Sequence, residues 1–375
     1  MNRKNVIIIL IDGGRLDRAQ NSPVFKTLKN KSAFFSSSIT YAPHTIAAMH
    51  AVFSGSYGTR TGTNSYWTTF KFKKDKFKTL TEYLKDNNFY THADVINELV
   101  VPKQGFYNFI VHDELNDDLM KRHKELLKKI PIIAQKNKNF FLYLHYSKIH
   151  TGIMNEVLKV YNNNSKEFFD NRTKNKQRYD TLFKNAEIYL QSVLDEINNL
   201  GLEKDSLILV ISDHGISVGE KFGECAYGAF CYDYTLRTFT YFLSEEFTSS
   251  EITQQIRTVD FMPSILELLH LPLDKNYSEL DGESLLPIIK GQNVSEKIAY
   301  SETGNPLEEK KPPKTPNTKS VRTSKWKLII NEYNNSKELY DLEKDPEENT
   351  NLIDTNLEIQ ETLWKKFLEI QNNSA

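Results

Sequence analysis

The sequence contains few residues that could stabilise the protein by covalent or metal cross-links. Only two of its 375 residues are cysteines, Cys225 and Cys231. This number excludes a disulfide-rich scaffold, which needs several cysteine pairs. The two cysteines also lack the second Cys/His pair that a zinc finger requires. We therefore interpret both as ordinary thiols and expect the fold to depend on buried apolar side chains.

Long apolar runs and an excess of charge are absent as well. No segment approaches the roughly 18 apolar residues of a membrane span, so we expect no span. Residues 1–4 (Met-Asn-Arg-Lys) lead directly into a strand-like run without a separate export signal, which predicts a cytoplasmic protein. The formal net charge is −1 and the pI is about 6.8, so no basic field indicates a nucleic-acid partner.

What the chain does contain is a regular alternation of strand-like and helix-like segments. Hydrophobic residues make up 39% and aromatic residues 12%, as in folded globular proteins. Strands are predicted at 6–11, 33–41, 90–96, 140–146 and 207–211, and helices at 22–31, 46–54, 78–87, 115–137 and 179–200. This order predicts an α/β fold, a three-layer sandwich with a mainly parallel central sheet. We interpret the Asn/Lys-rich stretch 161–177 as a mobile surface insertion.

The character of the sequence changes near residue 295. A charged, proline-rich loop is predicted at 304–319. Antiparallel strands are expected at 321–333 and 338–342, followed by a helix at 355–371. We therefore predict a main domain over 1–295 and a small α+β subdomain over 296–375.

Two of the predicted core strands end on side chains that can bind a metal. The apolar run Val6–Ile11 stops at Asp12, and the run Leu207–Ile211 is followed by Asp213 and His214. Open α/β sheets bind ligands at the carboxyl ends of their strands. A polar turn after a strand would explain Asp12 alone, but two such strand ends predict the two halves of a metal site.

Several motifs in order along the chain carry a resemblance to a known family. They include Asp12 with Arg15, the helix from Thr45 to Gly55, Ser212-Asp-His-Gly215 and Glu338-Leu-Tyr-Asp-Leu-Glu-Lys-Asp-Pro346. With these motifs the chain resembles the sulfatase-like branch of the alkaline phosphatase superfamily. The resemblance implies a large mixed sheet flanked by helices, a smaller C-terminal sheet, and a metal at the carboxyl edge of the large sheet.

The nucleophile position departs from that family. Sulfatases begin Cys-x-Pro-Ser-Arg with a Cys or Ser that is oxidised to formylglycine, and the matching position here is Thr45, followed by Ile46, Ala47, Ala48 and Met49. Threonine cannot become the aldehyde, because a methyl group occupies the place of the required hydrogen. The Gly-Lys-Trp-His-Leu-Gly signature is absent from residues 94–100 too. A threonine nucleophile resembles the phosphodiesterase and phosphoethanolamine-transferase relatives, which attack phosphorus.

The expected metal ligands are Asp12, Thr45, Asp213 and His214. Three oxygens and one imidazole nitrogen favour zinc or manganese over calcium. Sulfatases carry a second aspartate where this chain has Gly13, which again points away from calcium. Lys148 stands where relatives have an aspartate that could bind a second cation. We therefore predict one divalent metal.

Other residues are assigned to substrate handling. Thr45 is the predicted nucleophile, with a plain helix N-cap as the alternative. His150 is the candidate general acid, or else an ordinary loop histidine. His145, at the end of an apolar strand, is interpreted as structural. Arg15, Lys148, Tyr227 and Lys327 are the predicted substrate-binding residues.

Together these residues predict a metal-dependent hydrolase or phosphotransferase that acts through a phospho-threonine intermediate. The substrate would be a phosphate diester or phosphonate monoester on a small molecule, glycan or lipid headgroup. One alternative is a sulfuric ester hydrolase that works without formylglycine. Another is a non-catalytic protein that binds a phosphorylated glycan or lipid headgroup.

Overall fold

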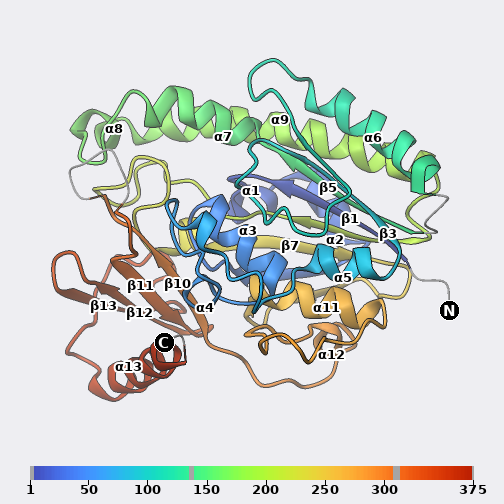
Figure 1. The fold of residues 1–375 in the computed structure, drawn as a ribbon. Coiled ribbons are helices and arrows are strands. Elements are labelled where there is room, and N and C mark those ends of the chain that lie inside the picture. The colour runs from blue at the N-terminus through green and yellow to red at the C-terminus, as the bar shows by residue number, and fades with distance from the viewer. Residues whose placement is uncertain (1–3, 135–138, 307–312, 374–375) are drawn as a thin grey trace.

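A mixed sheet forms the centre of the protein. The computed structural model describes residues 4–134, 139–306 and 313–373. Within these residues nine strands form one sheet in the order β4-β3-β5-β1-β6-β7-β2-β8, and β9 also pairs with β2 (Figure 1). The strands are β1 Asn5–Ile11, β2 Ala33–Ile39, β3 Phe89–Val95, β4 Asn108–Val111, β5 Asn139–Tyr146, β6 Ser206–Ile211, β7 Arg237–Leu243, β8 Ser250–Ile252 and β9 Ile256–Arg257. Strand β1 runs parallel to both neighbours, β5 and β6.

The alternating side chains of β1 divide the core into two layers. Ile7, Ile9 and Ile11 join the helices of one face, and Val6, Ile8 and Leu10 join those of the other. The first face is covered by α2 Pro23–Lys29, α6 Leu119–Ala134 and α9 Arg172–Asn199, and the second by α3 Thr45–Ser54, α5 Leu80–Asp86 and α11 Phe261–Leu268 (Figure 1). This arrangement confirms the predicted three-layer α/β fold.

Helix α3 begins one residue earlier than the sequence predicts. His44 is its N-cap residue and Thr45 is the first helical residue, without a capping hydrogen bond from the His44 side chain. The helix ends at Gly55 with a left-handed φ of 61°, a conformation that glycine adopts without a Cβ clash. Thr45 therefore does not fill the N-cap position, and its hydroxyl points toward other groups.

The C-terminal part adds a second sheet. Strands β10 Ala299–Thr303, β11 Thr318–Arg322, β12 Trp326–Asn331 and β13 Ser336–Asp341 pair antiparallel in that order. Helix α13 Leu357–Asn372 packs on it, and Tyr41 and Ala47 of the main part share the same apolar core (Figure 1). The small antiparallel sheet is thus confirmed, whereas the domain boundary at residue 295 stays a prediction.

Some predicted elements differ from the structure. The single strand expected at 321–333 is two strands, β11 and β12, joined by a turn in which Thr323 N donates to Trp326 O. The stretch 161–177 contains helix α8 Lys166–Asp170 and the start of α9, because Phe168 is buried and anchors it. Parts of the predicted 115–137 helix and 304–319 loop, residues 135–137 and 307–312, lie outside the described residues.

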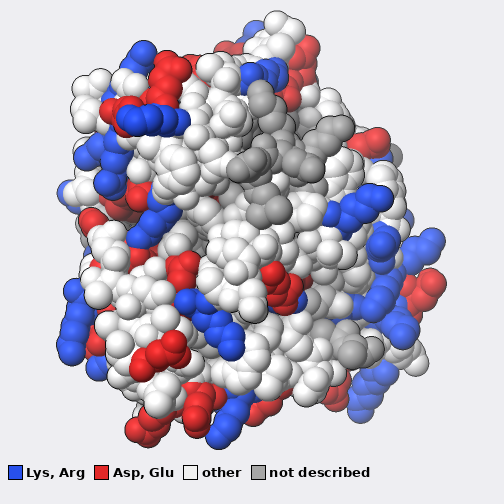
Figure 2. Space-filling model, turned by 90° about the vertical axis from the view of Figure 1, so that its left-hand side faces the viewer, with Lys and Arg blue, Asp and Glu red and all other residues white. Residues whose placement is uncertain are grey.

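The surface of the protein carries charges of both signs. On the face in Figure 2, basic and acidic side chains are interspersed with uncharged surface. No helix among the described residues is long and apolar enough to cross a membrane.

A buried ionic cluster joins the C-terminal sheet to the main part. Lys327 on β12 is 0% exposed, and its Nζ lies 2.8 Å from both Asp233 Oδ1 and Glu348 Oε1. Arg322 on β11 also binds Asp233, at 2.8 Å. Burial raises the pKa of Glu348 to about 7 despite the opposing effect of Lys327. The lysine therefore compensates two carboxylates that would be costly to bury alone.

We predict that Lys327→Ala lowers the free energy of unfolding by about 3 kcal/mol or more, because it leaves Glu348 buried without a cationic partner. Chemical denaturation measures the change. Lys325→Ala is the matched control, since Lys325 pairs with Glu343 on the surface and should contribute less than about 1 kcal/mol. An equal decrease in the free energy of unfolding for the two variants would contradict the stabilising role of Lys327 in the buried cluster.

Candidate active site

Four of the predicted residues meet at the carboxyl edge of the large sheet. Asp12 follows β1, and Asp213 and His214 follow the neighbouring parallel strand β6. Ligand atoms from these three side chains all lie within 4.8 Å of one another. Thr45 Oγ1, at the start of α3, lies 3.4 Å from both Asp12 Oδ2 and His214 Nε2. The structure therefore brings together the four residues predicted as metal ligands.

The polar atoms at this point fit a divalent cation. Asp12 Oδ1 and Asp213 Oδ2 are buried without a hydrogen-bond partner. His214 Nδ1 lies 2.9 Å from the Gly215 carbonyl, to which it donates, so Nε2 carries the lone pair that can bind a metal. Unpaired buried carboxylate oxygens are costly. A metal bound to these oxygens and to Nε2 would satisfy them.

The two carboxyl groups have different electrostatic environments. Burial raises the pKa of the Asp12 carboxyl, but His150, His145 and His214 outweigh it and hold that pKa at about 2. Burial, followed by the charge of Asp12, raises the pKa of Asp213. The two carboxylates repel each other, and a bound cation would offset this repulsion.

His145 has a more specific place than the structural role that the sequence suggests. Its Nε2 lies 2.9 Å from Asp12 Oδ2, and the side chain is buried at the end of β5. This contact fixes the position of Oδ2 in the Asp12 carboxylate. We therefore regard His145 as a positioning residue for Asp12.

His150 and Tyr227 lie on the open side of the four residues. The Tyr227 hydroxyl is 3.1 Å from His150 Nδ1, and the Tyr227 ring centroid is 4.5 Å from that of His214. Both residues, with Asp12 and Thr45, line a pocket of about 570 Å³. The structure thus places the predicted nucleophile and the predicted general acid in one cavity.

The three predicted basic substrate ligands have other partners. Arg15 Nη1 donates to Ile216 O and to Glu220 Oε1, at 2.7 and 2.6 Å. Lys148 Nζ donates to Glu114 O at 3.0 Å, and Lys327 is in the buried cluster described above. None of the three lines the pocket. The positions of these three residues in the motifs predicted that they bind the phosphate. Their side chains instead turn toward partners that are mostly distant in sequence.

The comparison with family models decides the family. The model described as Sulfatase matches residues 4–271, more than half of the chain. The chain belongs to the sulfatase family. A second model, N-sulphoglucosamine sulphohydrolase, C-terminal, matches residues 230–373 and covers the small sheet with α13. This sulfatase-family protein is therefore an ester hydrolase by family, in the alkaline phosphatase superfamily.

Solved structures share the fold across nearly the whole chain. BT1596, a 2-O GAG sulfatase, has a TM-score of 0.80 at 15% identity, covering 99% of this chain and 92% of that one. The phosphonate monoester hydrolase SpPMH from Silicibacter pomeroyi has a TM-score of 0.78 at 14% identity, covering 100% and 96%. BT4656, solved with D-glucosamine-2-N,6-O-disulfate, has a TM-score of 0.73 at 16% identity, covering 99% and 98%. No curated protein matches the sequence.

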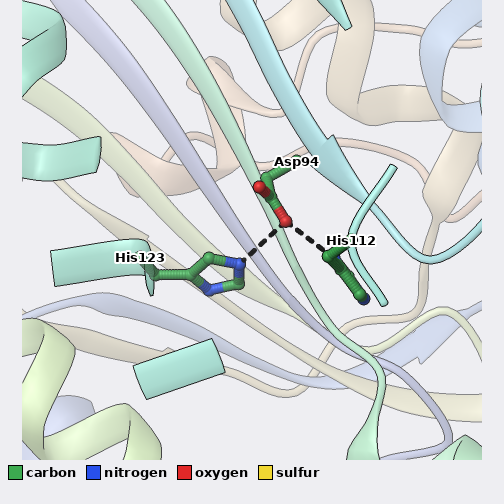
Figure 3. Close-up of side chains that lie close together, drawn as sticks. All are labelled: Asp94, His112 and His123. Carbon is green, nitrogen blue, oxygen red and sulfur yellow. Dashed lines mark hydrogen bonds and ion pairs between the residues drawn. The ribbon is translucent and has the colours of Figure 1, made fainter. Parts of the chain in front are cut away.

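Sequence reasoning missed a second buried cluster, Asp94, His112 and His123, which Figure 3 shows converging from β3, the loop after β4, and α6. Asp94 Oδ1 lies 2.6 Å from His112 Nδ1 and 3.4 Å from His123 Nε2. Arg122 Nε binds the other carboxylate oxygen at 2.5 Å. The residues are far apart in sequence, so no local spacing could have indicated the cluster.

This cluster is closed by hydrogen bonds. His112 Nε2 lies 3.0 Å from Ser147 Oγ, and His123 Nδ1 lies 2.6 Å from the Tyr189 hydroxyl. Every ring nitrogen and both Asp94 oxygens thus have a protein partner, whereas Asp12 Oδ1 and Asp213 Oδ2 have no hydrogen-bond partner. Ser147 is the N-cap residue of α7 Lys148–Ile153, which carries His150. The cluster therefore supports the helix that brings His150 into the pocket.

We predict that Asp94→Asn destabilises the protein by about 3 kcal/mol at pH 7. Burial raises the pKa of Asp94, but hydrogen bonds from His112 and His123 outweigh it and hold the pKa well below its usual range. In the unfolded protein the pKa of this carboxyl is about 3.9. Because the folded protein holds it lower, ionised Asp94 stabilises the fold above about pH 3.9, and this stabilisation decreases as the pH falls below that value. Chemical denaturation at a series of pH values from 7 to 3 should show that the difference in the free energy of unfolding between the variant and wild type becomes smaller at the lowest pH values.

The control for this variant is Asp170→Asn. Asp170 pairs with Lys166 on the surface of α8 and should contribute less than about 1 kcal/mol at any pH. A difference for Asp94→Asn that stays constant down to pH 3 would contradict the ionised role of Asp94.

Proposed function

We propose that this sulfatase-family protein is a metal-dependent hydrolase or transferase of phosphate diesters or phosphonate monoesters, with Thr45 as the nucleophile. The observation that supports the proposal is the position of Thr45 Oγ1 at 3.4 Å from Asp12 and from His214, beside two unpartnered buried carboxylate oxygens. A threonine at this position is compatible with attack on phosphorus but not with conversion to formylglycine.

Asp12, Asp213, His214 and the Thr45 hydroxyl would hold the metal, with zinc or manganese suited to this donor set. When bound, the metal would lower the pKa of the hydroxyl and neutralise the charge of the ester. The chain itself contributes the N-terminus of α3, whose free N–H groups and positive dipole end favour an anion beside Thr45.

The reaction transfers the phosphoryl centre to Thr45. The Thr45 hydroxyl proton passes to Asp12 Oδ2, its hydrogen-bond partner, as the bond from Oγ1 to phosphorus forms. The bond to the leaving oxygen breaks, and His150 gives that oxygen a proton. Tyr227 holds His150 through Nδ1. Water or an acceptor alcohol then forms a bond to phosphorus and gives its proton to His150, while the bond between phosphorus and Oγ1 breaks and Oγ1 takes back the proton from Asp12.

Hydrolysis of a sulfuric ester is the second candidate, and the comparisons support it better than the first. The matching family models are those of sulfatases, and the solved relatives are mostly sulfatases with one phosphonate monoester hydrolase. Their names suggest sulfated glycan esters as a substrate class. Both candidates use the same group of Asp12, Thr45, Asp213 and His214. They differ in the atom that is attacked, which is phosphorus in the first and sulfur in the second.

Parallel assays of 4-nitrophenyl sulfate and bis(4-nitrophenyl) phosphate separate the two candidates. The first candidate predicts a kcat/KM for the phosphodiester that exceeds that for the sulfate by at least about 100-fold, since a threonine lacks the hydrate chemistry of formylglycine. The reverse order would replace the first candidate by the second.

We predict that Thr45→Ala lowers kcat by more than about 1,000-fold, because it removes the attacking oxygen. Circular dichroism and thermal unfolding should remain close to wild type. Thr45→Ser keeps a hydroxyl and should restore much of the rate. Near-full activity of Thr45→Ala would refute the nucleophile assignment, and ligand binding without turnover by wild type would favour a non-catalytic role.

Removal of the metal should inactivate the protein and lower its melting temperature, because no bound cation then offsets the repulsion between the carboxylates of Asp12 and Asp213. Zinc or manganese added back should restore both, with calcium less effective. Elemental analysis gives the metal content, and Asp213→Asn should weaken metal binding. Full activity of protein with no detectable metal would contradict the mechanism.

A further inference from the structure

A loop rich in lysine and phenylalanine lies between α4 Gly58–Thr61 and α5. Residues 70–76, Phe-Lys-Phe-Lys-Lys-Asp-Lys, contain four lysines and one acidic residue, and we call this segment the lysine loop. All four lysines are exposed. Within the part of the chain that the structure describes, none of them forms an ion pair, whereas surface lysines such as Lys166 and Lys325 do. The lysine loop therefore presents uncompensated positive charge to its surroundings.

The backbone of the lysine loop is held by hydrogen bonds to neighbouring segments. Lys73 N donates to Thr61 O at 2.8 Å, and Ser278 N donates to Lys76 O at 2.8 Å. Within the loop, Phe77 N and Lys76 N both donate to Lys73 O, at 3.0 and 2.9 Å. These bonds close a turn over residues 73–77. The lysines are thus carried by a fixed turn, which keeps them together on the surface.

The aromatic residues of this region divide into two that pack inward and two that project. Phe77 is buried, and the half-buried Phe72 packs against His50 with ring centroids 5.8 Å apart. Phe70, in contrast, is 86% exposed, the highest fraction among the exposed large hydrophobic side chains of the described residues, and Trp67 is 50% exposed. Phenylalanine has no polar group for water, so Phe70 would gain from burial against an apolar partner.

The acidic groups beside the lysine loop do not cancel its charge. Four lysines and Asp75 give the loop a net charge of +3. The turn that Ser278 joins to the loop contributes exposed Lys275 and Glu279, which cancel each other.

The next basic residue, Lys78, lies between two acidic partners, Asp86 at 2.7 Å and Asp274 at 3.3 Å. This group carries one negative charge, so the described region keeps a net charge of +2 around Phe70. The whole chain has a formal net charge of −1, and the positive charge is therefore a local feature.

The residue types of the lysine loop indicate the kind of anion that it suits. Arginine binds a phosphate through two hydrogen bonds and stacks on nucleobases, but every cation of the loop is a lysine, which acts as a point charge on a flexible stem. Such lysines suit an extended anionic surface. Clusters of four or more lysines bind the anionic headgroups of a membrane, and exposed Trp and Phe enter the interfacial region of a bilayer.

We propose that the lysine loop, together with Trp67 and Phe70, is a docking surface for an anionic phospholipid bilayer. The lysines contact the headgroups, while Phe70 and Trp67 enter the boundary between headgroups and acyl chains. This binding is peripheral and does not depend on the ester hydrolysis proposed above. Because Trp67 also lines the pocket of Thr45, a docked bilayer lies beside that pocket.

Vesicle sedimentation tests the role of charge. At low salt the full-length protein should partition onto phosphatidylcholine vesicles that contain about 30 mol% phosphatidylglycerol at least about 10-fold more strongly than onto pure phosphatidylcholine. The difference should decrease at about 0.5 M salt, because salt screens the lysines. Equal partition onto the two kinds of vesicle, or no partition onto either, would overturn the proposal.

Charge reversal within the lysine loop locates the surface. The double variant Lys73→Glu with Lys74→Glu should weaken partition onto the anionic vesicles by about 10-fold or more. The matched control is Lys174→Glu with Lys176→Glu, which makes the same change in net charge at exposed positions of α9, on the other face of the sheet. Thermal unfolding should show that both variants are folded. Equal weakening by the two double variants would overturn the proposal.

Insertion of the aromatic residues distinguishes a bilayer from a soluble polyanion. Brominated acyl chains quench tryptophans that enter a bilayer, so Phe70→Trp should be quenched more than wild type on anionic vesicles that contain them. The control Ile188→Trp, at a 55% exposed position of α9, should show no added quenching. Binding to heparin or single-stranded DNA without added quenching of Phe70→Trp would assign the lysine loop to a soluble polyanion and overturn the proposal.

Discussion

The repulsion between two buried carboxylates is the constraint on which this structure depends. Asp12 and Asp213 approach each other because β1 and β6 are parallel neighbours in the middle of the sheet. The protein stabilises the pair with backbone donors, since Gly13 N and His214 N both bind Asp213 Oδ1, at 3.1 and 2.9 Å. His145 binds Asp12. One oxygen of each carboxylate remains without a hydrogen-bond partner, and a cation bound there would relieve the repulsion.

The position of the nucleophile depends on both sheets. Thr45 opens α3, and α3 packs with Met49 and Phe53 against the large sheet. Ala47 and Ala51 on the same helix belong to the apolar core of the C-terminal sheet. The helix is thus held between two layers, which limits movement of the Thr45 hydroxyl relative to Asp12. The C-terminal sheet contributes to the site by packing, without adding a side chain to the metal-type cluster.

The two histidine–aspartate clusters illustrate opposite uses of the same residue types. Around Asp94 every polar atom has a protein partner, so the cluster stabilises the loops and the start of α7. Around Asp12, by contrast, one oxygen of Asp12 and one of Asp213 have no hydrogen-bond partner, and they lie beside the Thr45 hydroxyl and the pocket. Satisfied polar networks give rigidity, whereas unsatisfied ones give binding capacity at a cost in stability.

The sequence by itself determined the fold class and the convergence of Asp12, Asp213 and His214, because buried runs define the strands and parallel strands end at one edge. Thr45 was assigned to the same site through the resemblance to the sulfatase-like family. Only the tertiary structure decided where the long side chains point. Arg15, Lys148 and Lys327 carry motif positions but have partners such as Glu220 and Asp233 that no local pattern reveals. The Asp94 cluster likewise arises from distant segments. Backbone periodicity is encoded locally, but a charged side chain turns toward whichever partner the whole fold supplies.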